Sequence, residues 1–202
     1  YKLFSADEDW SELNLYNTEP EKVTDFVVDA SDIPSSLKKA VTVTLTGEWD
    51  SDAFNLLSMA LGNNGGLFVT TNATLVTLDM SRIKVAENTP LWRQGLKEYG
   101  IFNNCTALEK VIMPTAEEAG HFTKLNKAFE GCTALRDIDL SLLTGATDIE
   151  AAFKGTAIEK ADLSGCTSLG STVSAFEGCA ALQEVICAGK LYVCRLYRTE
   201  AH

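Results

Sequence analysis

Apolar and polar residues alternate along a short segment, LRDIDLS, at residues 135–141. In an extended backbone Ile138 and Leu140 share one face, whereas Asp137 and Asp139 point to the other. This alternation is typical of a strand with one buried side and one side facing solvent. We therefore predict a half-buried β-strand here.

The same pattern recurs along the chain. Four segments align: IFNNCTALEKVIMP (101–114), AFEGCTALRDIDLS (128–141), AFKGTAIEKADLS (152–164) and AFEGCAALQEVICA (175–188), and NATLVTLDMS (72–81) matches their second half. The aligned phenylalanines, Phe102, Phe129, Phe153 and Phe176, are 27, 24 and 23 residues apart. Repeats of this length are typical of a solenoid, in which each unit buries its apolar face only against its neighbours.

Each part of the repeat has a predicted role. The extended halves stack into a parallel β-ladder, and the phenylalanine fills the interior between successive units. The turn that follows needs a left-handed backbone, which Gly131, Gly155 and Gly178 adopt readily and Asn104 tolerates. The cysteines of the repeat are Cys105, Cys132 and Cys179. We expect them to be small buried residues of the scaffold.

The segments before the repeats are predicted to be irregular early turns. Residues 41–47 alternate as a strand, and 51–62 form a helix that Asp50, Ser51 or Asp52 caps and Gly62 ends. Residues 25–40 are predicted to be a strand and then a short helix that begins at Pro34. We therefore divide the chain into an N-terminal segment and irregular cap, 1–39, and a solenoid, 40–202, in one compact array.

The carboxyl-terminal residues are predicted to close the stack. Residues 190–197, KLYVCRLY, are expected to form a last strand that covers the open edge. Cys187 and Cys194 could pair across that turn or remain free thiols, and the sequence leaves both alternatives open.

Composition excludes several classes of protein. The net charge is −11 and the lysines and arginines do not cluster, which argues against nucleic-acid binding. No apolar run approaches the ~20 residues of a membrane helix. Six cysteines without a C-x-x-C pair and two histidines give no support to a metal site, and no cofactor is expected. A chain that opens at Tyr1 is consistent with a processed or engineered fragment whose signal peptide has been removed.

Motifs of catalysis are missing from the sequence. We find no G-x-S-x-G, P-loop, G-x-G-x-x-G or H-E-x-x-H pattern, and we expect His121 to be an ordinary surface residue. The sequons at Asn72 and Asn104 are interpreted as turn residues without a glycan. We therefore expect a protein that is not an enzyme and has no catalytic residues.

The combination of AF-x-G-C with L-x-x-I-x-L resembles the BspA-like leucine-rich repeats of bacterial cell-surface and secreted proteins. The resemblance covers residues 72–188 and, through a similar opening turn, extends back to about residue 40. It implies an α/β solenoid: a right-handed leucine-rich-repeat superhelix with a parallel β-ladder and short helical or irregular return legs. It also implies an extracellular or cell-surface protein that binds other macromolecules. The third copy departs from the pattern, because KGTAI replaces EGCTAL.

Two groups of residues are candidate binding surfaces. The first is the outward side of the strands: Thr77, Asp79, Lys110, Ile112, Asp137, Asp139, Lys160, Asp162, Glu184 and Ile186. The alternative is that this side is merely a solvated face. The second is the irregular stretch 81–100, with Trp92, Arg93 and Tyr99, which are residue types common at interface hot spots. The alternative is that Trp92 packs against the side of the stack.

The function expected from these surfaces is binding or adhesion without catalysis. The ligand would be a protein or a glycan outside the cell, bound by the solenoid face or by the 81–100 insertion. A second hypothesis is a structural spacer or assembly subunit of a surface protein. A cation such as calcium on the acidic face is a further alternative.

Overall fold

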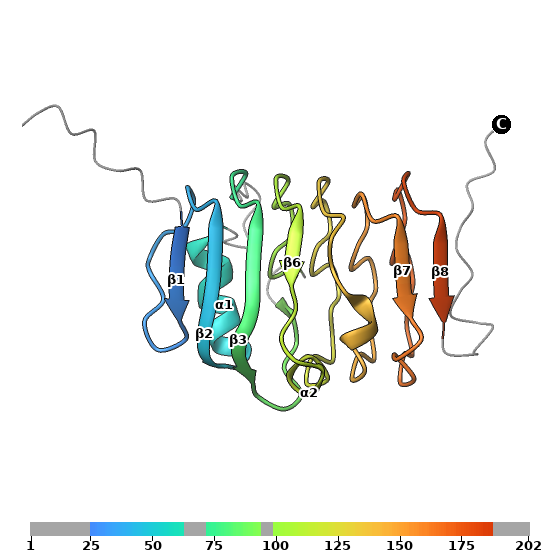
Figure 1. Cartoon of the computed structure of the whole chain (residues 1–202), viewed down its shortest axis with the longest axis horizontal. Coiled ribbons are helices and arrows are strands. Elements are labelled where there is room, and N and C mark those ends of the chain that lie inside the picture. The colour runs from blue at the N-terminus through green and yellow to red at the C-terminus, as the bar shows by residue number, and fades with distance from the viewer. Residues whose placement is uncertain (1–24, 63–71, 94–98, 188–202) are drawn as a thin grey trace, which may run out of the picture.

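The computed structural model describes residues 25–62, 72–93 and 99–187. The elements in chain order are β1 (Asp25–Asp29), β2 (Thr42–Trp49), α1 (Ser51–Ala60), β3 (Thr77–Val85), β4 (Trp92–Arg93), β5 (Tyr99–Gly100), β6 (Lys110–Ile112), α2 (Ala116–Ala119), the 3-10 helix η2 (Leu140–Leu142), β7 (Lys160–Leu163) and β8 (Glu184–Cys187). Figure 1 shows the long strands side by side along the longest axis of the molecule, in the order of the sequence.

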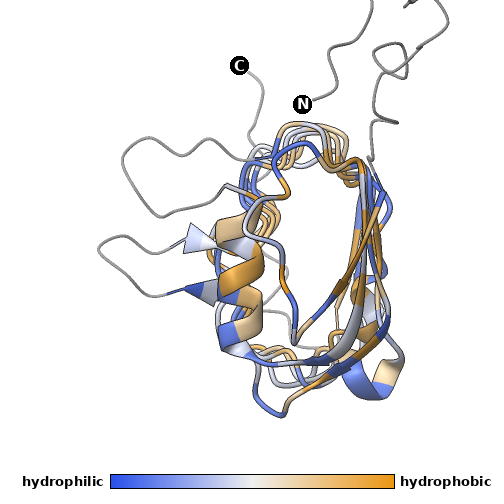
Figure 2. Cartoon of the chain, turned by 90° about the vertical axis from the view of Figure 1, so that its left-hand side faces the viewer, coloured by the Kyte–Doolittle hydropathy of each residue, from blue (hydrophilic) through white to orange (hydrophobic). Residues whose placement is uncertain are grey.

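The strands pair in parallel with their neighbours in the sequence. One sheet has the order β1-β2-β3-β6, and β7 pairs with β8 in a second. Between the sheets a single parallel bridge joins Lys110 to Asp137, and the amide of Ala157 donates to the carbonyl of Leu135 over 3.0 Å. Viewed from the amino-terminal end, successive segments lie over one another around a common interior, with the strands on one side and α1 on the other (Figure 2).

The predicted strand at 135–141 is wrong in its second half. Asp137 makes its bridge, but the chain turns at Asp139 and the 3-10 helix begins at Leu140. The cause is local, because the Asp139 carboxylate accepts hydrogen bonds from the backbone N–H and the hydroxyl of Ser141, over 3.0 and 2.6 Å. Leu140 is nevertheless buried and Ile138 packs against the core, so the apolar face was assigned correctly.

The four repeat phenylalanines form one continuous stack. Adjacent ring centroids along Phe102, Phe129, Phe153 and Phe176 are 5.3, 5.7 and 5.5 Å apart, and the ring planes are 14°, 11° and 12° from parallel. The first three rings are fully buried, and Phe176 is partly buried. The predicted phenylalanine plug is confirmed.

The turns after the phenylalanines adopt the predicted left-handed backbone. Gly131, Gly155 and Gly178 have φ of 76°, 73° and 74°, and Asn104 takes the same place with φ of 58°. A second left-handed position, two residues before the phenylalanine, was not predicted: Lys127, Ala151 and Ser174 have φ of 57°, 51° and 52°. Residues with a Cβ adopt this conformation at a cost of ~1–2 kcal/mol. Hydrogen bonds between segments compensate for it, as from the Lys127 amide to the Glu150 carbonyl over 2.8 Å.

Two of the three cysteines predicted to be buried, Cys105 and Cys132, lie inside, whereas Cys179 is only partly buried. Cys105 and Cys132 are buried free thiols, and burial raises the pKa of Cys105 to about 12. The Cys132 thiol donates to the Phe102 carbonyl over 3.1 Å. In the third copy Thr156 takes the place of the cysteine, and its hydroxyl donates to the Phe153 carbonyl over 2.8 Å. The position therefore requires a small side chain that can donate, which both residues provide.

The amino-terminal segments agree with the prediction for α1 and differ for 34–40. Asp50 caps α1 by accepting from the amides of Asp52 and Ala53, and Gly62 follows the helix with φ of 98°. Residues 34–40 form turns and no helix. The Leu37 amide donates to a carbonyl at the end of α1, that of Ala60, over 2.7 Å, and not to a carbonyl of its own segment.

The predicted boundary at residue 39 falls inside one sheet, because β1 pairs with β2 in parallel. Residues 1–24 of the predicted N-terminal segment lie outside the described part of the chain, as does the predicted strand 190–197. Cys187 is disulfide-bonded. Its predicted partner Cys194 also lies outside the described residues.

Candidate binding surfaces

The outward side chains predicted from the strands fall into two columns, and strand pairing is interrupted in both columns between the two parallel sheets. The first column contains Thr77, Lys110, Asp137, Lys160 and Glu184, and the second contains Asp79, Ile112, Asp139, Asp162 and Ile186. The register places Thr77 opposite Lys110 and Asp79 opposite Ile112 in the first sheet. In the second sheet it places Lys160 opposite Glu184 and Asp162 opposite Ile186.

Ion pairs join neighbours along the first column. The Lys110 ammonium lies 2.7 Å from the Asp137 carboxylate, and the Lys160 ammonium lies 3.0 Å from the Glu184 carboxylate. All four side chains are about half exposed. Exposed pairs of this kind contribute at most ~1 kcal/mol each, because water screens them. Their charges are available to a ligand only after these contacts rearrange.

The second column combines carboxylates with isoleucines. Ile112 and Ile186 are each partly exposed, and the register places Ile112 opposite Asp79 and Ile186 opposite Asp162. Asp139 and Asp162 occupy equivalent positions in successive copies of the repeat. No strand pairing joins their segments within the described chain, because the turn into η2 interrupts the extended backbone after Asp139.

The aspartates of this column each close a short turn with a serine two residues later. The carboxylates of Asp79, Asp139 and Asp162 accept from the amides of Ser81, Ser141 and Ser164 over 2.8, 3.0 and 2.9 Å. The hydrogen bonds from Ser164 hold the pKa of Asp162 below its usual range.

Asp29 makes the same turn at the end of β1, where its carboxylate accepts from the amide and the hydroxyl of Ser31. These bonds and a further one from the Thr46 hydroxyl, 2.9 Å away, hold the pKa of Asp29 below its usual range. Sequence reasoning missed the motif, although D-x-S recurs at 29–31, 79–81, 139–141 and 162–164. The carboxylates of Asp29 and Asp162 therefore shape the ends of β1 and β7, and that of Asp139 shapes the turn into η2. The bond made by Asp79 lies within β3, beside the register shift between β2 and β3.

The second predicted surface lies on another side of the molecule. Strands β4 and β5 pair in antiparallel fashion, with Trp92 opposite Gly100 and Arg93 opposite Tyr99. The Arg93 guanidinium lies 5.9 Å from the centroid of the Tyr99 ring, and the Lys124 ammonium lies 5.9 Å from that of Trp92. Figure 2 shows these two short strands beside α1, across the interior from the long strands. The two predicted surfaces are thus separate regions.

The predicted insertion at 81–100 is largely part of the regular stack. Residues 81–85 extend β3 to Val85. The chain then pairs with the next segment, since Thr89 donates to the His121 carbonyl over 3.0 Å and accepts from the Thr123 amide over 3.1 Å. Part of the insertion therefore makes β3 longer, and residues 86–93 pair with the following segment instead of forming a separate loop.

His121 and Glu118 together fix the end of β3. The Glu118 carboxylate accepts from the Val85 amide over 2.6 Å, and His121 Nδ1 lies 2.6 Å from the Val85 carbonyl oxygen. His121 was predicted to be an ordinary surface residue; its side chain is 33% exposed, and its contact with the Val85 carbonyl was not predicted. Nothing in the sequence around His121 indicates the pairing, since 36 residues separate the partners.

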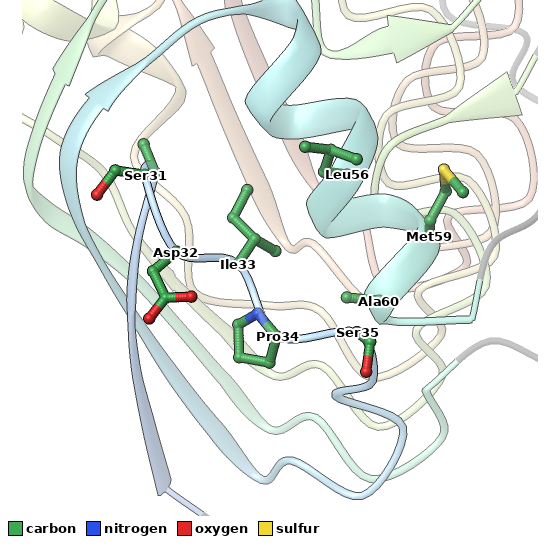
Figure 3. Close-up of a pocket in the computed structure, with 9 residues that line it drawn as sticks. Ser31, Asp32, Ile33, Pro34, Ser35, Leu56, Met59 and Ala60 are labelled. Atoms are coloured by element: carbon green, nitrogen blue, oxygen red, sulfur yellow. The ribbon is translucent and has the colours of Figure 1, made fainter.

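A pocket at the amino-terminal end was not predicted from the sequence. It encloses about 450 Å³ between residues 30–35 and α1. Figure 3 shows Ile33 and Pro34 on one wall and Leu56 and Met59 on the other. Its polar lining groups belong to Ser31, Asp32 and Ser35.

Among the described residues, no three histidine, cysteine, aspartate or glutamate side chains are grouped so that they could hold a metal ion. Within the same residues, every helix is too short or too polar to cross a membrane. Comparison of the chain with protein-family models, with curated proteins and with solved structures gave no match.

Proposed function

We propose that this chain is a leucine-rich-repeat solenoid of the BspA-like kind that binds a macromolecule outside the cell without catalysing a reaction. The ligand class is a protein or a glycan. The binding surface is the outward side of the parallel strands, and the region of Trp92, Arg93 and Tyr99 is the second candidate surface.

The observation that carries this proposal is the regular spacing of different side chains on the outward columns. Neighbouring strands in a sheet are ~4.8 Å apart, so each strand adds one position to each column at a fixed interval. The column that contains Ile112 and Ile186 combines apolar groups with carboxylates. An extended surface of this composition suits a large ligand that makes many weak contacts.

The disulfide at Cys187 supports a location outside the cell. Disulfides persist in oxidising compartments and are rare in a reducing cytosol. The other cysteines of the described chain, Cys105, Cys132, Cys166 and Cys179, are free thiols, and the first three are buried.

Binding to an array of extracellular-matrix proteins, mucins, bacterial surface components and glycans tests the proposal. Once a ligand is found, Ile112→Lys and Ile186→Lys should weaken binding about tenfold or more, because each places a charge in the apolar part of the column. Val173→Lys is the matched control, since Val173 is 63% exposed and lies on another segment. If Trp92→Ala alone weakens binding, the second surface is the site. If the array gives no ligand at all, the proposal fails.

A structural spacer or assembly subunit is the second candidate. It is favoured by the exposed ion pairs that join successive segments, which are Lys110 with Asp137, Lys154 with Glu177 and Lys160 with Glu184. These charges stabilise the stack itself and leave fewer groups for a ligand. Sedimentation and small-angle scattering test this function, which predicts self-association or a rigid elongated particle.

A further inference from the structure

Apolar side chains are exposed mainly at the amino-terminal end of the stack. Within the described residues, the large apolar side chains with high exposure are Val27 (71%), Val173 (63%), Leu56 (53%) and Met59 (44%). Val27 belongs to β1, and Leu56 and Met59 lie together on α1, whereas Val173 lies far along the chain. Grouped apolar exposure of this kind marks interaction sites in soluble proteins.

Leu56 and Met59 form one wall of the 450 Å³ pocket described above, and Ile33 and Pro34 form the facing wall (Figure 3). The volume lies within the range of sites that enclose a ligand or a bound side chain. An apolar group that entered this pocket would remove the exposed side chains of Leu56 and Met59 from water, which is favourable because apolar surface is buried.

The pocket adjoins a free strand edge. Among the described strands β1 pairs with β2 alone, so the other edge of residues 25–28 carries backbone N–H and C=O groups without a strand partner. Asp29 is bridged to Asp32, whose amide donates to the Asp29 carbonyl over 3.0 Å. The pocket lining starts at Ala30, one residue after β1 ends at Asp29. An extended peptide that paired with β1 could therefore reach the pocket with one of its side chains, which is the usual arrangement when a peptide adds a strand to a sheet.

Charge selects among the segments that could dock at this end. Residues 25–62 have a net charge of −4, from six acidic and two basic residues. The acidic residues are Asp25, Asp29, Asp32, Glu48, Asp50 and Asp52, and the basic residues are Lys38 and Lys39. Residues 1–24 also contain six acidic and two basic residues, again −4. Like charges therefore oppose docking of the preceding segment and of the same end of a second copy, whereas a cationic peptide is attracted.

We propose that the edge of β1 and the adjacent pocket bind an extended peptide segment of another protein that is positively charged and carries a large apolar side chain. The peptide backbone pairs with β1, and the apolar side chain fills the pocket between Ile33 and Met59. This site is distinct from the outward columns and from the Trp92 region, so it stands or falls independently of the proposed function.

The test titrates the full chain with a synthetic peptide of alternating lysine and leucine, KLKLKLK with blocked ends, and measures binding by calorimetry. The expected result is saturable binding of one peptide per chain. The double variant Leu56→Gln, Met59→Gln should weaken binding about tenfold or more, because the pocket wall becomes polar without a change of charge. Val173→Gln, the same change at the exposed valine elsewhere, should leave binding unchanged.

The proposal would be overturned if the double variant bound the peptide with unchanged affinity, or if the acidic peptide ELELELE bound equally well. It would also be overturned if the wild type formed a dimer in sedimentation that the double variant abolished, because a second copy of the chain would then be the occupant. A measurement on the unaltered chain guards against a variant that fails to fold. A photoreactive leucine in the peptide should crosslink to residues 30–35 or 56–60, and crosslinks confined to other segments would also contradict the site.

Discussion

Phe129 stacks on Phe153 with ring centroids 5.7 Å apart and ring planes 11° from parallel, although 24 residues separate them in the chain. Each ring also lies against a further phenylalanine, Phe102 on one side and Phe176 on the other. The amide of Phe129 donates to the Ala152 carbonyl over 2.8 Å, and that of Phe153 donates to the Ala175 carbonyl over 2.9 Å. Side-chain stacking and backbone pairing therefore fix the same alignment between segments.

Replacement of either ring should destabilise the fold strongly. Phe129→Ala or Phe153→Ala is expected to cost ~3–5 kcal/mol, because each leaves a cavity between two neighbouring rings. Denaturant unfolding monitored by circular dichroism measures the change in free energy. Val173→Ala, at an exposed site, should change it by less than ~0.5 kcal/mol. A loss below ~1 kcal/mol for both phenylalanine variants would contradict the role assigned to the stack.

Two equivalent glycines offer a matched comparison of backbone strain and steric contact. Gly131 and Gly155 have nearly equal φ of 76° and 73°, so alanine at either position costs the same left-handed strain, ~1–2 kcal/mol. A Cβ on Gly131 would also overlap Asn104 Oδ1, whereas one on Gly155 would have no atom within 4 Å. Gly131→Ala should therefore be the more destabilising by ~1 kcal/mol. Thermal melting of both variants measures the difference, and equal melting temperatures would exclude the contact.

The stability of the protein should fall in acid. Hydrogen bonds hold the pKa of Asp162 and of Asp29 below their usual ranges, and the Lys154 ammonium does the same for the pKa of Glu177. The folded state therefore binds fewer protons than the unfolded state in this range. The stabilisation is complete above the unfolded-state pKa values of about 4 and is lost as the pH falls through the lower folded-state values.

Melting temperatures measured from about pH 7 down to about pH 2 test this expectation. Asp162→Asn keeps the shape of the side chain and removes its titration. The melting temperature of this variant should therefore fall less in acid than that of the wild type. Asp25→Asn, at an exposed aspartate in β1, is the control. An identical pH profile for Asp162→Asn and the wild type would show that the serine turn does not contribute.

The buried thiols should resist alkylation while the protein is folded. Burial raises the pKa of Cys105 to about 12, and it also raises the pKa of Cys132. Only the thiolate reacts, and both groups are shielded from the reagent. Iodoacetamide at about pH 8 should therefore label the half-buried Cys179 first, and Cys105 and Cys132 only after unfolding in urea. Peptide mass spectrometry without reduction identifies the sites, and rapid native labelling of Cys105 would contradict its interior place.

Sequence reasoning succeeded where a residue type has one dominant physical role. A glycine in a tight turn supplies a left-handed backbone, and a phenylalanine repeated at one position of each unit must be buried, so Gly131 and Phe129 were assigned correctly. It was wrong where two local structures compete. At Asp139 the alternating pattern indicated a strand, but the hydrogen bonds to Ser141 turned the chain instead.

Contacts between distant segments were beyond prediction from the sequence. Asn72 was interpreted as a turn residue, and its Oδ1 does accept from the amides of Thr74 and Leu75 over 2.6 and 2.7 Å. Its side chain is also fully buried and donates to the carbonyls of Leu37 and Ala40 over 2.6 and 3.1 Å. These two carbonyls lie more than 30 residues away, and no local pattern specifies them.

The sequence by itself determined the spacing of the repeats, the apolar face of each extended segment and the position of the phenylalanine, because these follow from periodicity and side-chain size. Only the tertiary structure decided which outward residues are adjacent, that the Trp92 region lies apart from them, and that a pocket opens beside Met59. Those features depend on the register between segments and on how far each one extends. Register is set by hydrogen bonds and packing across the stack, and the local sequence of one segment does not specify these contacts.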